Sequence, residues 1–222
     1  MREKGFTLVE MVVVLAVVAI LAAILIPTVA KHIEDAKITR ANNEVQVIAS
    51  AIASLYKDTG FWPCTDADGP SGGVNRVLSD PLHVVNAADG GVTGARNWGT
   101  WNPSKPLYDY IFYNNPDNDT GVTNQNQPGA DYPTSGEFRW RGPYLDEEVM
   151  PDPWGYSYVI NARYFPGNAL TTVAMRRGHR VYVLSAGSNK TWETPFDDGV
   201  TRPNDAIGGD DIGVAIYTNS EY

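Results

Sequence analysis

The sequence predicts an α+β protein: a long, kinked amino-terminal helix, whose first half spans a membrane, packs along its second half on a small antiparallel β-sheet head. Three observations predict this class. An unbroken apolar run, residues 11–26, follows a short charged leader. Apolar residues at helical spacing continue beyond Pro27, and stretches that alternate apolar and polar residues occur in the carboxyl-terminal third. A chain of 222 residues has room for one domain and an anchor.

The apolar run is long enough to cross a bilayer. Every side chain in residues 11–26 is aliphatic or Met, and with Leu8 and Val9 the stretch reaches the ~18 to 20 residues that a spanning helix needs. A cleavable secretory signal is the alternative, because Arg2 and Lys4 provide a positive flank. The apolar part of such a signal is usually ~7 to 15 residues and ends in small residues. Here the run is longer and leads into a helical pattern, so we expect a membrane helix.

Glu10 is an acid inside this apolar stretch. A carboxylate near the bilayer centre costs about 2.5 to 3.5 kcal/mol on insertion scales, and less near an end. Intramembrane acids usually have a function and a partner. We therefore interpret Glu10 as an assembly residue; the alternative is a chance acid at the membrane interface.

The second half of the helix has one apolar stripe. Pro27 should kink the helix or open one turn rather than end it, because it removes one amide donor and crowds the carbonyl four residues back. Gly60 suits a left-handed carboxyl-terminal cap, and Pro63 blocks continuation. The stripe, expected to pack against the head, consists of Ile33, Ala41, Val45, Ile48, Ile52 and Leu55.

Three strands are predicted in the head, at residues 156–164, 179–185 and 212–217, from alternation and from β-branched and aromatic content. Residues 64–141 show little periodicity, and only 107–113 reads as a possible short strand. So long a segment inside a compact head suggests a functional or surface-covering insertion.

Two sets of motifs resemble a known family. The run Gly5-Phe6-Thr7-Leu8-Val9-Glu10 before an apolar helix resembles the signal of type IV pilins and of type II secretion pseudopilins. A second set is similar to the core of the major pseudopilin of type II secretion, although the connection corresponding to residues 64–141 is much shorter there and the resemblance does not cover this segment. This fold motif, whose local chemistry is that of a turn, comprises Gly142, Pro143, Tyr144, Asp152, Pro153, Trp154 and Gly155.

The resemblance implies a pilin fold and a processing event. Prepilin peptidase would cut between Gly5 and Phe6 and methylate the new amino group of Phe6, which could neutralise Glu10 of a neighbouring subunit. We assign Phe6, Glu10 and Pro27 to assembly. The implied organisation is a leader at 1–5, a transmembrane and assembly helix at 6–27, an amphipathic half at 28–58, and a head at 59–222 with the insertion at 64–141.

A calcium site is expected in the loop of residues 186–211, which is rich in Gly, Asn and Asp. Calcium takes six to eight oxygen ligands, and the resembling pseudopilins hold calcium at this place. Here Asn189 replaces the family's first acid and the spacer is longer. The expected ligands are Asp210 or Asp211, with Asn189 and the Leu184 carbonyl behind them; the alternative is a solvated acidic loop.

Other classes of function find little support. The formal net charge of −9 argues against general nucleic-acid binding. The single Cys64 cannot form an intramolecular disulfide, and we expect it to be a buried small hydrophobe. The three histidines, His32, His83 and His179, are scattered, and no nucleophile-elbow, phosphate-loop, HExxH or CxxC pattern occurs. We therefore expect no enzyme activity and no cofactor besides calcium.

The predicted function is a structural subunit of a type IV pilus-like filament, with the major pseudopilin of type II secretion as the favoured role. The expected partners are identical subunits, prepilin peptidase, an inner-membrane assembly platform and the membrane. The subunit would cross the inner membrane once, with its head in the periplasm, and then enter a periplasmic pseudopilus or an extracellular pilus. The alternatives are a type IV pilin of a surface pilus, for adhesion, motility or DNA uptake, and a membrane-anchored head that binds a ligand.

Overall fold

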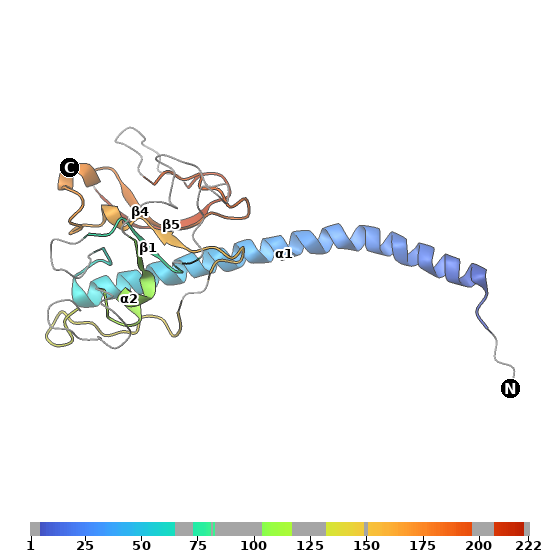
Figure 1. The fold of residues 1–222 in the computed structure, drawn as a ribbon, viewed down its shortest axis with the longest axis horizontal. Helices are drawn as coiled ribbons and strands as arrows, with labels where there is room; N and C mark the ends of the chain where they lie inside the picture. Colours follow the sequence, from blue (N-terminus) through green and yellow to red (C-terminus); the bar gives the residue numbers. More distant parts are fainter. Residues whose placement is uncertain are drawn as a thin grey trace. The chain divides into compact units, whose positions relative to one another are not determined.

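The computed structural model describes residues 5–64, 73–80, 82, 104–116, 132–148, 151–196 and 207–219. The chain forms two compact units, Met1–Thr39 and Arg40–Tyr222. A single helix, α1 (Leu8–Thr59), contributes to both (Figure 1). We call residues 8–26 the apolar span and the second unit the head.

The first unit is a helix with an exposed apolar surface. The large aliphatic side chains of the apolar span are all exposed, and α1 is, within the described residues, the one helix long and apolar enough to cross a membrane by length and composition. The helix continues through Pro27 without a break, as expected. Ile33, predicted to belong to the buried stripe, is 54% exposed.

In the head, α1 presents the predicted stripe to the core. Its buried apolar residues recur every three or four positions, so they share one face of the helix. The helix ends at Thr59, and Gly60 follows with φ of +77°, its amide donating to the Tyr56 carbonyl at 2.8 Å. The predicted glycine cap is therefore confirmed. The buried apolar residues of α1 are Ala41, Val45, Ile48, Ala51, Ile52 and Leu55.

A five-stranded sheet packs in the head in the order β2-β1-β3-β4-β5. Its strands are β1 (Arg76–Leu78), β2 (Ser104–Pro106), β3 (Val159–Ile160), β4 (Arg180–Ser185) and β5 (Ile212–Thr218). The last three are antiparallel to their neighbours, as predicted, and so are β1 and β3, whereas β1 and β2 run parallel. The α+β class is confirmed, and the sheet is mixed rather than purely antiparallel.

Strand β3 is shorter than the predicted 156–164, and it ends at Ile160 because the side chain of Asn161 takes the hydrogen bonds that a longer strand would make. The Asn161 Oδ1 accepts from the Tyr182 amide at 2.7 Å, and its Nδ2 donates to the Arg180 carbonyl at 2.9 Å. These bonds occupy the backbone groups that a longer β3 would pair with. The chain then leaves the sheet in a 3₁₀ turn, η2 (Ala162–Tyr164).

The predicted strand at 107–113 is wrong: this segment forms a helix, α2 (Leu107–Ile111). Its buried apolar residues are Leu107, Tyr110 and Ile111, spaced three and four apart, which is helical periodicity. The aromatic content of this segment favoured a strand, whereas the three- and four-residue spacing of its apolar residues is that of the helix observed. Through β1, β2 and α2, the described parts of 64–141 contribute directly to the sheet and the core.

Aromatic rings fill the end of the core. The Trp62 ring stacks on Tyr56, with centroids 4.1 Å apart, and on Phe165, at 4.6 Å. Cys64 beside it is free and buried, as expected. Burial raises the pKa of the Cys64 thiol to about 12, so it stays a neutral small hydrophobe at physiological pH.

Candidate functional site

The amino terminus of α1 is fixed by a reciprocal pair of side chains, Thr7 and Glu10. The Thr7 amide and hydroxyl donate to the Glu10 Oε2 at 2.8 and 2.7 Å, and the Glu10 amide donates to the Thr7 Oγ1 at 3.2 Å. This is a capping box, in which two orphan amides at a helix start receive partners. The sequence signal for this cap is the Thr-x-x-Glu spacing before an apolar run, and the cap was not among the predicted features.

The predicted processing residues lie just before this cap. Gly5 and Phe6 are exposed and outside any helix or strand, and the Phe6 side chain is 83% exposed. A Cβ built on Gly5 would have no atom within 4 Å. The Gly5–Phe6 bond is therefore free of packing by the described residues, and Glu10 follows four residues after Phe6 in the chain.

The second motif forms a turn held by a buried carboxylate. The Asp152 Oδ1 accepts from the amides of Trp154, at 3.0 Å, and Tyr156, at 2.9 Å, and its Oδ2 accepts from the Ser185 hydroxyl on β4. Gly155 takes a φ of +89°. Burial raises the pKa of Asp152, against the lowering effect of these hydrogen bonds. The geometry is that of a structural turn, as the sequence indicated.

Tyr144, the centre of the first part of the fold motif, ties its loop to two helices. Its amide donates to the Ile111 carbonyl at the end of α2 at 2.9 Å, and its hydroxyl accepts from the Arg141 amide at 3.0 Å. The Arg141 Nε lies 3.9 Å from the Asp58 Oδ1 in the last turn of α1. These contacts position the loop along α1.

The loop around Asp210 brings together three of the expected acidic and polar residues. The Asp210 Oδ2 accepts from the Ser188 hydroxyl at 2.9 Å and from the Asn189 amide at 2.8 Å. The Asp211 Oδ2 accepts from two backbone amides of residues 193 and 194. Glu193, which was not among the predicted ligands, joins them because its Oε2 accepts from the Asp210 amide at 2.7 Å.

Two carboxylate oxygens in this loop fit a hard cation. The Oδ1 atoms of Asp210 and Asp211 are buried and have no hydrogen-bond partner among the described residues, and orphaned carboxylate oxygens are what calcium binds. Burial raises the pKa of Asp211 to about 7. Asn189 fits less well because its Oδ1 accepts from the Thr191 amide at 2.7 Å, and Leu184 lies inside β4 between two paired strands.

No cluster of three or more His, Cys, Asp or Glu side chains arranged for a metal occurs in the described part of the chain. Asp197, Asp198 and Asp205, the other acids of the predicted loop, lie outside that part. The described residues therefore provide a partial ligand set, in which Asp210 and Asp211 are the candidates.

Comparisons with known proteins agree with the amino-terminal motif. The family model described as a prokaryotic N-terminal methylation motif matches residues 1–26. The chain is 33% identical over 94 residues to the fimbrial protein EcpC of Eikenella corrodens, covering 42% of this chain and 61% of that protein. It is 31% identical over 91 residues to the type IV major pilin PilE1 of Neisseria gonorrhoeae, covering 41% and 42%.

A relative from the secretion systems also matches. The type II secretion system core protein G of Pseudomonas aeruginosa is 36% identical over 64 residues, which is 29% of this chain and 45% of that protein. The chain thus spans about half the length of the curated relatives it matches, and no solved structure matches it. The methylation motif, these relatives and the helix-on-sheet fold together support a type IV pilin or pseudopilin family for this chain.

Proposed function

We propose that this chain is a structural subunit of a type IV pilus-like filament, anchored and assembled through the apolar span. One observation carries the proposal: the apolar span is exposed along its length and begins with a capped acid, Glu10, and both lie within residues 1–26, which match a methylation motif. A helix that is apolar on every face needs lipid or other helices around it. Membrane storage and helix-to-helix assembly each supply such surroundings.

The proposed mechanism is an exchange of lipid for neighbouring helices. Prepilin peptidase cuts between Gly5 and Phe6 and methylates the Phe6 amine, which still carries a positive charge. Withdrawn from water, that charge and the Glu10 carboxylate are each costly alone. Pairing between neighbouring copies removes the cost and fixes the register of the packed helices.

Within the family, we propose the role of major pseudopilin of type II secretion. The fold motif around Tyr144 and Trp154 supports it, as does the similarity to core protein G. Relatives named as major pilins support the runner-up, a surface pilus. The subunit would wait in the inner membrane with its head in the periplasm, in contact with an assembly platform. Electron microscopy of sheared surface material separates the two roles, because long fibres of this chain indicate a pilus, and a secretion defect without fibres indicates a pseudopilus.

The decisive test compares two substitutions at Glu10. Glu10→Gln removes the charge but keeps a side chain that serves in a capping box, whereas Glu10→Ala removes both. We expect both variants to be processed, with the mature mass showing loss of residues 1–5 and gain of a methyl group, and both to fail in polymerisation. Normal polymerisation of Glu10→Gln would show that Glu10 acts only as a helix cap.

We also propose that the loop containing Asp210 and Asp211 binds calcium. The two unpartnered carboxylate oxygens support this assignment. Bound calcium would neutralise adjacent buried acids and stabilise the loop between β4 and β5. A direct test is isothermal titration of the detergent-solubilised chain with calcium alone, with the Asp210→Asn variant expected to lose the binding.

A further inference from the structure

The head carries a basic, partly apolar projection around helix α3 (Val173–Arg176). Residues 153–192 contain four arginines, one lysine and no acidic residue, in a chain whose formal net charge is −9. In their midst three apolar side chains are exposed: Val173 at 64%, Met175 at 48% and Leu170 at 37%. We call Leu170, Val173, Met175, Arg176 and Arg177 the basic knob.

The basic knob is held in place by its own hydrogen bonds. The Thr172 hydroxyl caps α3 by accepting from the Met175 amide at 3.3 Å, and the Arg176 Nη1 donates to the Thr171 carbonyl at 2.7 Å. Arg177 is exposed and makes no hydrogen bond or ion pair with any residue that the structure describes. The basic knob therefore presents its exposed apolar side chains on a backbone that hydrogen bonds hold in place.

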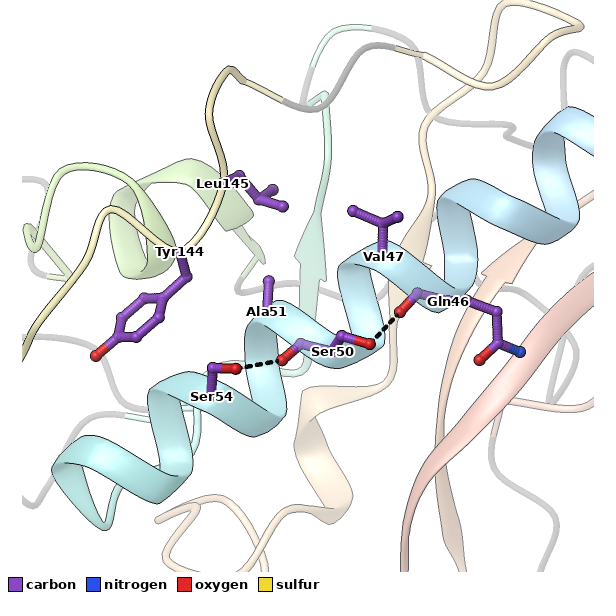
Figure 2. A pocket seen from close by; sticks show the side chains of 7 residues that line it. All are labelled: Gln46, Val47, Ser50, Ala51, Ser54, Tyr144 and Leu145. Atoms are coloured by element: carbon purple, nitrogen blue, oxygen red, sulfur yellow. Dashed lines mark hydrogen bonds between the residues drawn. The ribbon is translucent and has the colours of Figure 1, made fainter.

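A groove of matching chemistry lies on another part of the head. It is an open cavity of about 310 Å³ between α1 and the loop that carries Tyr144 and Leu145 (Figure 2). Val47, Ala51 and Leu145 give it apolar walls, and the small side chains of Ser50 and Ser54 leave room along the helix. Their hydroxyls are already bonded to the α1 backbone, so they do not demand a polar partner.

Three exposed acids, Asp146, Glu147 and Glu148, follow Leu145 of the groove directly in the chain. Glu148 accepts from the Tyr113 hydroxyl at 2.7 Å, whereas Asp146 and Glu147 have no partner among the described residues. Arg141, on the same loop, is paired with Asp58. We call the cavity and these three acids the acidic groove.

The knob and the groove cannot meet within one head. In Figure 1 the orange segment with α3 and the yellow loop before residue 149 lie on opposite sides of the carboxyl-terminal half of α1. The basic knob and the acidic groove are complementary in charge, and both have apolar contact area. Because they lie on opposite sides of one head, they can meet only between two copies of the chain. Such a contact is heterologous, and its repetition generates an open helical array when the rotation between copies does not close a ring.

We propose that the basic knob of one copy docks into the acidic groove of a second copy, with Val173 and Met175 against α1 and Arg177 facing Asp146 and Glu147. The inference rests on the proposed filament function and names a contact between heads within it. Opposite charges at the rim of an interface set orientation and exclude wrong registers, while the apolar side chains supply contact area.

Disulfide cross-linking of the full chain, in cells that also make prepilin peptidase, tests the docking. The double variant Val173→Cys, Ser50→Cys should give a ladder of multimers on a non-reducing gel, because each copy offers both halves of the contact. Each single variant should give dimers at most. Cys64 does not interfere because it is buried.

The outcomes separate the docking from the filament function. Filaments in electron micrographs without a ladder would overturn the docking and leave the filament function standing. Neither filaments nor a ladder would overturn both, and a ladder supports the docking.

Charge exchange gives an independent measurement. Arg177→Glu and Glu147→Arg, each added to the cysteine pair, should reduce the ladder about two- to fivefold, as expected for an exposed ion pair, and the two together should restore it. The matched control is Arg139→Glu, an exposed arginine outside both surfaces, which should leave the ladder unchanged. Equal loss in the control and in Arg177→Glu, or no recovery in the combined variant, would contradict the pairing.

Discussion

Two stretches of the same helix face opposite environments. Between residues 8 and 26, α1 is apolar on every face and exposed on every face, whereas between residues 41 and 55 it buries a single stripe in the head. Helical hydrogen bonding is common to both, so the difference is in the side chains alone. A helix with one apolar stripe can bury that stripe against its own head. A helix without a polar face needs lipid or other helices from outside the chain.

The largest expected effect is on the buried stripe. Ile52→Ala should lower the free energy of unfolding of the head by about 2 to 5 kcal/mol, because it removes methyl groups from a closed core and leaves a cavity. Ile20→Ala, the same change in the apolar span, should leave that free energy unchanged. Chemical denaturation of the detergent-purified chain, followed by tryptophan fluorescence, measures both. An equal decrease in the free energy of unfolding in both variants would show that the apolar span contributes to the stability of the head.

The next effect concerns Asp211 and pH. Its pKa rises from 3.8 to about 7 in the folded head because burial disfavours the charged form. Between these values the folded state holds a proton that the unfolded state has released, so stability falls as pH rises, by at most about 1.4 kcal/mol per unit. Thermal melts in chelator from pH 4 to 8 should show this decline, and calcium at pH 8 should reverse it.

Asp211→Asn sharpens that prediction, since the amide oxygen still accepts from the loop amides. The variant should have a flatter pH profile and no response to calcium. Asp146→Asn, an exposed acid elsewhere on the head, serves as the control and should behave as the parent does. A calcium response that persists in Asp211→Asn would remove Asp211 from the ligand set.

A smaller effect is expected at the helix exit. Gly60 has a φ of +77°, and an L-residue in the left-handed region costs roughly 1 to 2 kcal/mol. Gly60→Ala should reduce the free energy of unfolding by about that amount, although open space surrounds the position. Gly5→Ala, at the other end and outside any helix, should have no effect on the head. A neutral Gly60→Ala would show that the cap is dispensable.

The smallest effect is local to the amino terminus. Thr7→Val removes the hydroxyl that caps α1 while keeping its shape, at a cost of about 0.5 to 2 kcal/mol in helix stability. We expect fraying of the first turn, detectable as faster amide exchange at residues 8–11, with no change in the melting of the head. Unchanged exchange would show that the surroundings of the helix, rather than the cap, hold its start.

The sequence predicted those features that come from long, strongly periodic patterns. The apolar span, the stripe of α1 and the cap at Gly60 all follow from spacing and from glycine chemistry. Strands β1 and β2 could not be predicted in the same way, because three residues are too few to show alternation. The wrong prediction at residues 107–113 has a different cause. The aromatic composition of this segment favours a strand, but the spacing of Leu107, Tyr110 and Ile111 is helical.

At the amino terminus, Glu10 could be identified from the sequence, but the only partner predicted for it was the Phe6 amine of a neighbouring subunit. The structure adds the partner in its own chain, Thr7, which a four-residue pattern could have revealed. Glu193 could not be found by spacing, because its place beside Asp210 depends on a loop that closes between β4 and β5. The ending of β3 at Ile160 likewise depends on which backbone groups Asn161 reaches.

The bond between Thr7 and Glu10 has a consequence for the reversibility of the proposed filament. In a waiting subunit the Glu10 carboxylate accepts hydrogen bonds from Thr7 but has no counter-charge, so joining a neighbour adds the positive partner that the cap cannot supply. A departing subunit keeps its Thr7 cap, so its helix start stays ordered without a neighbour. Disassembly into the bilayer would leave each protomer ready for reuse.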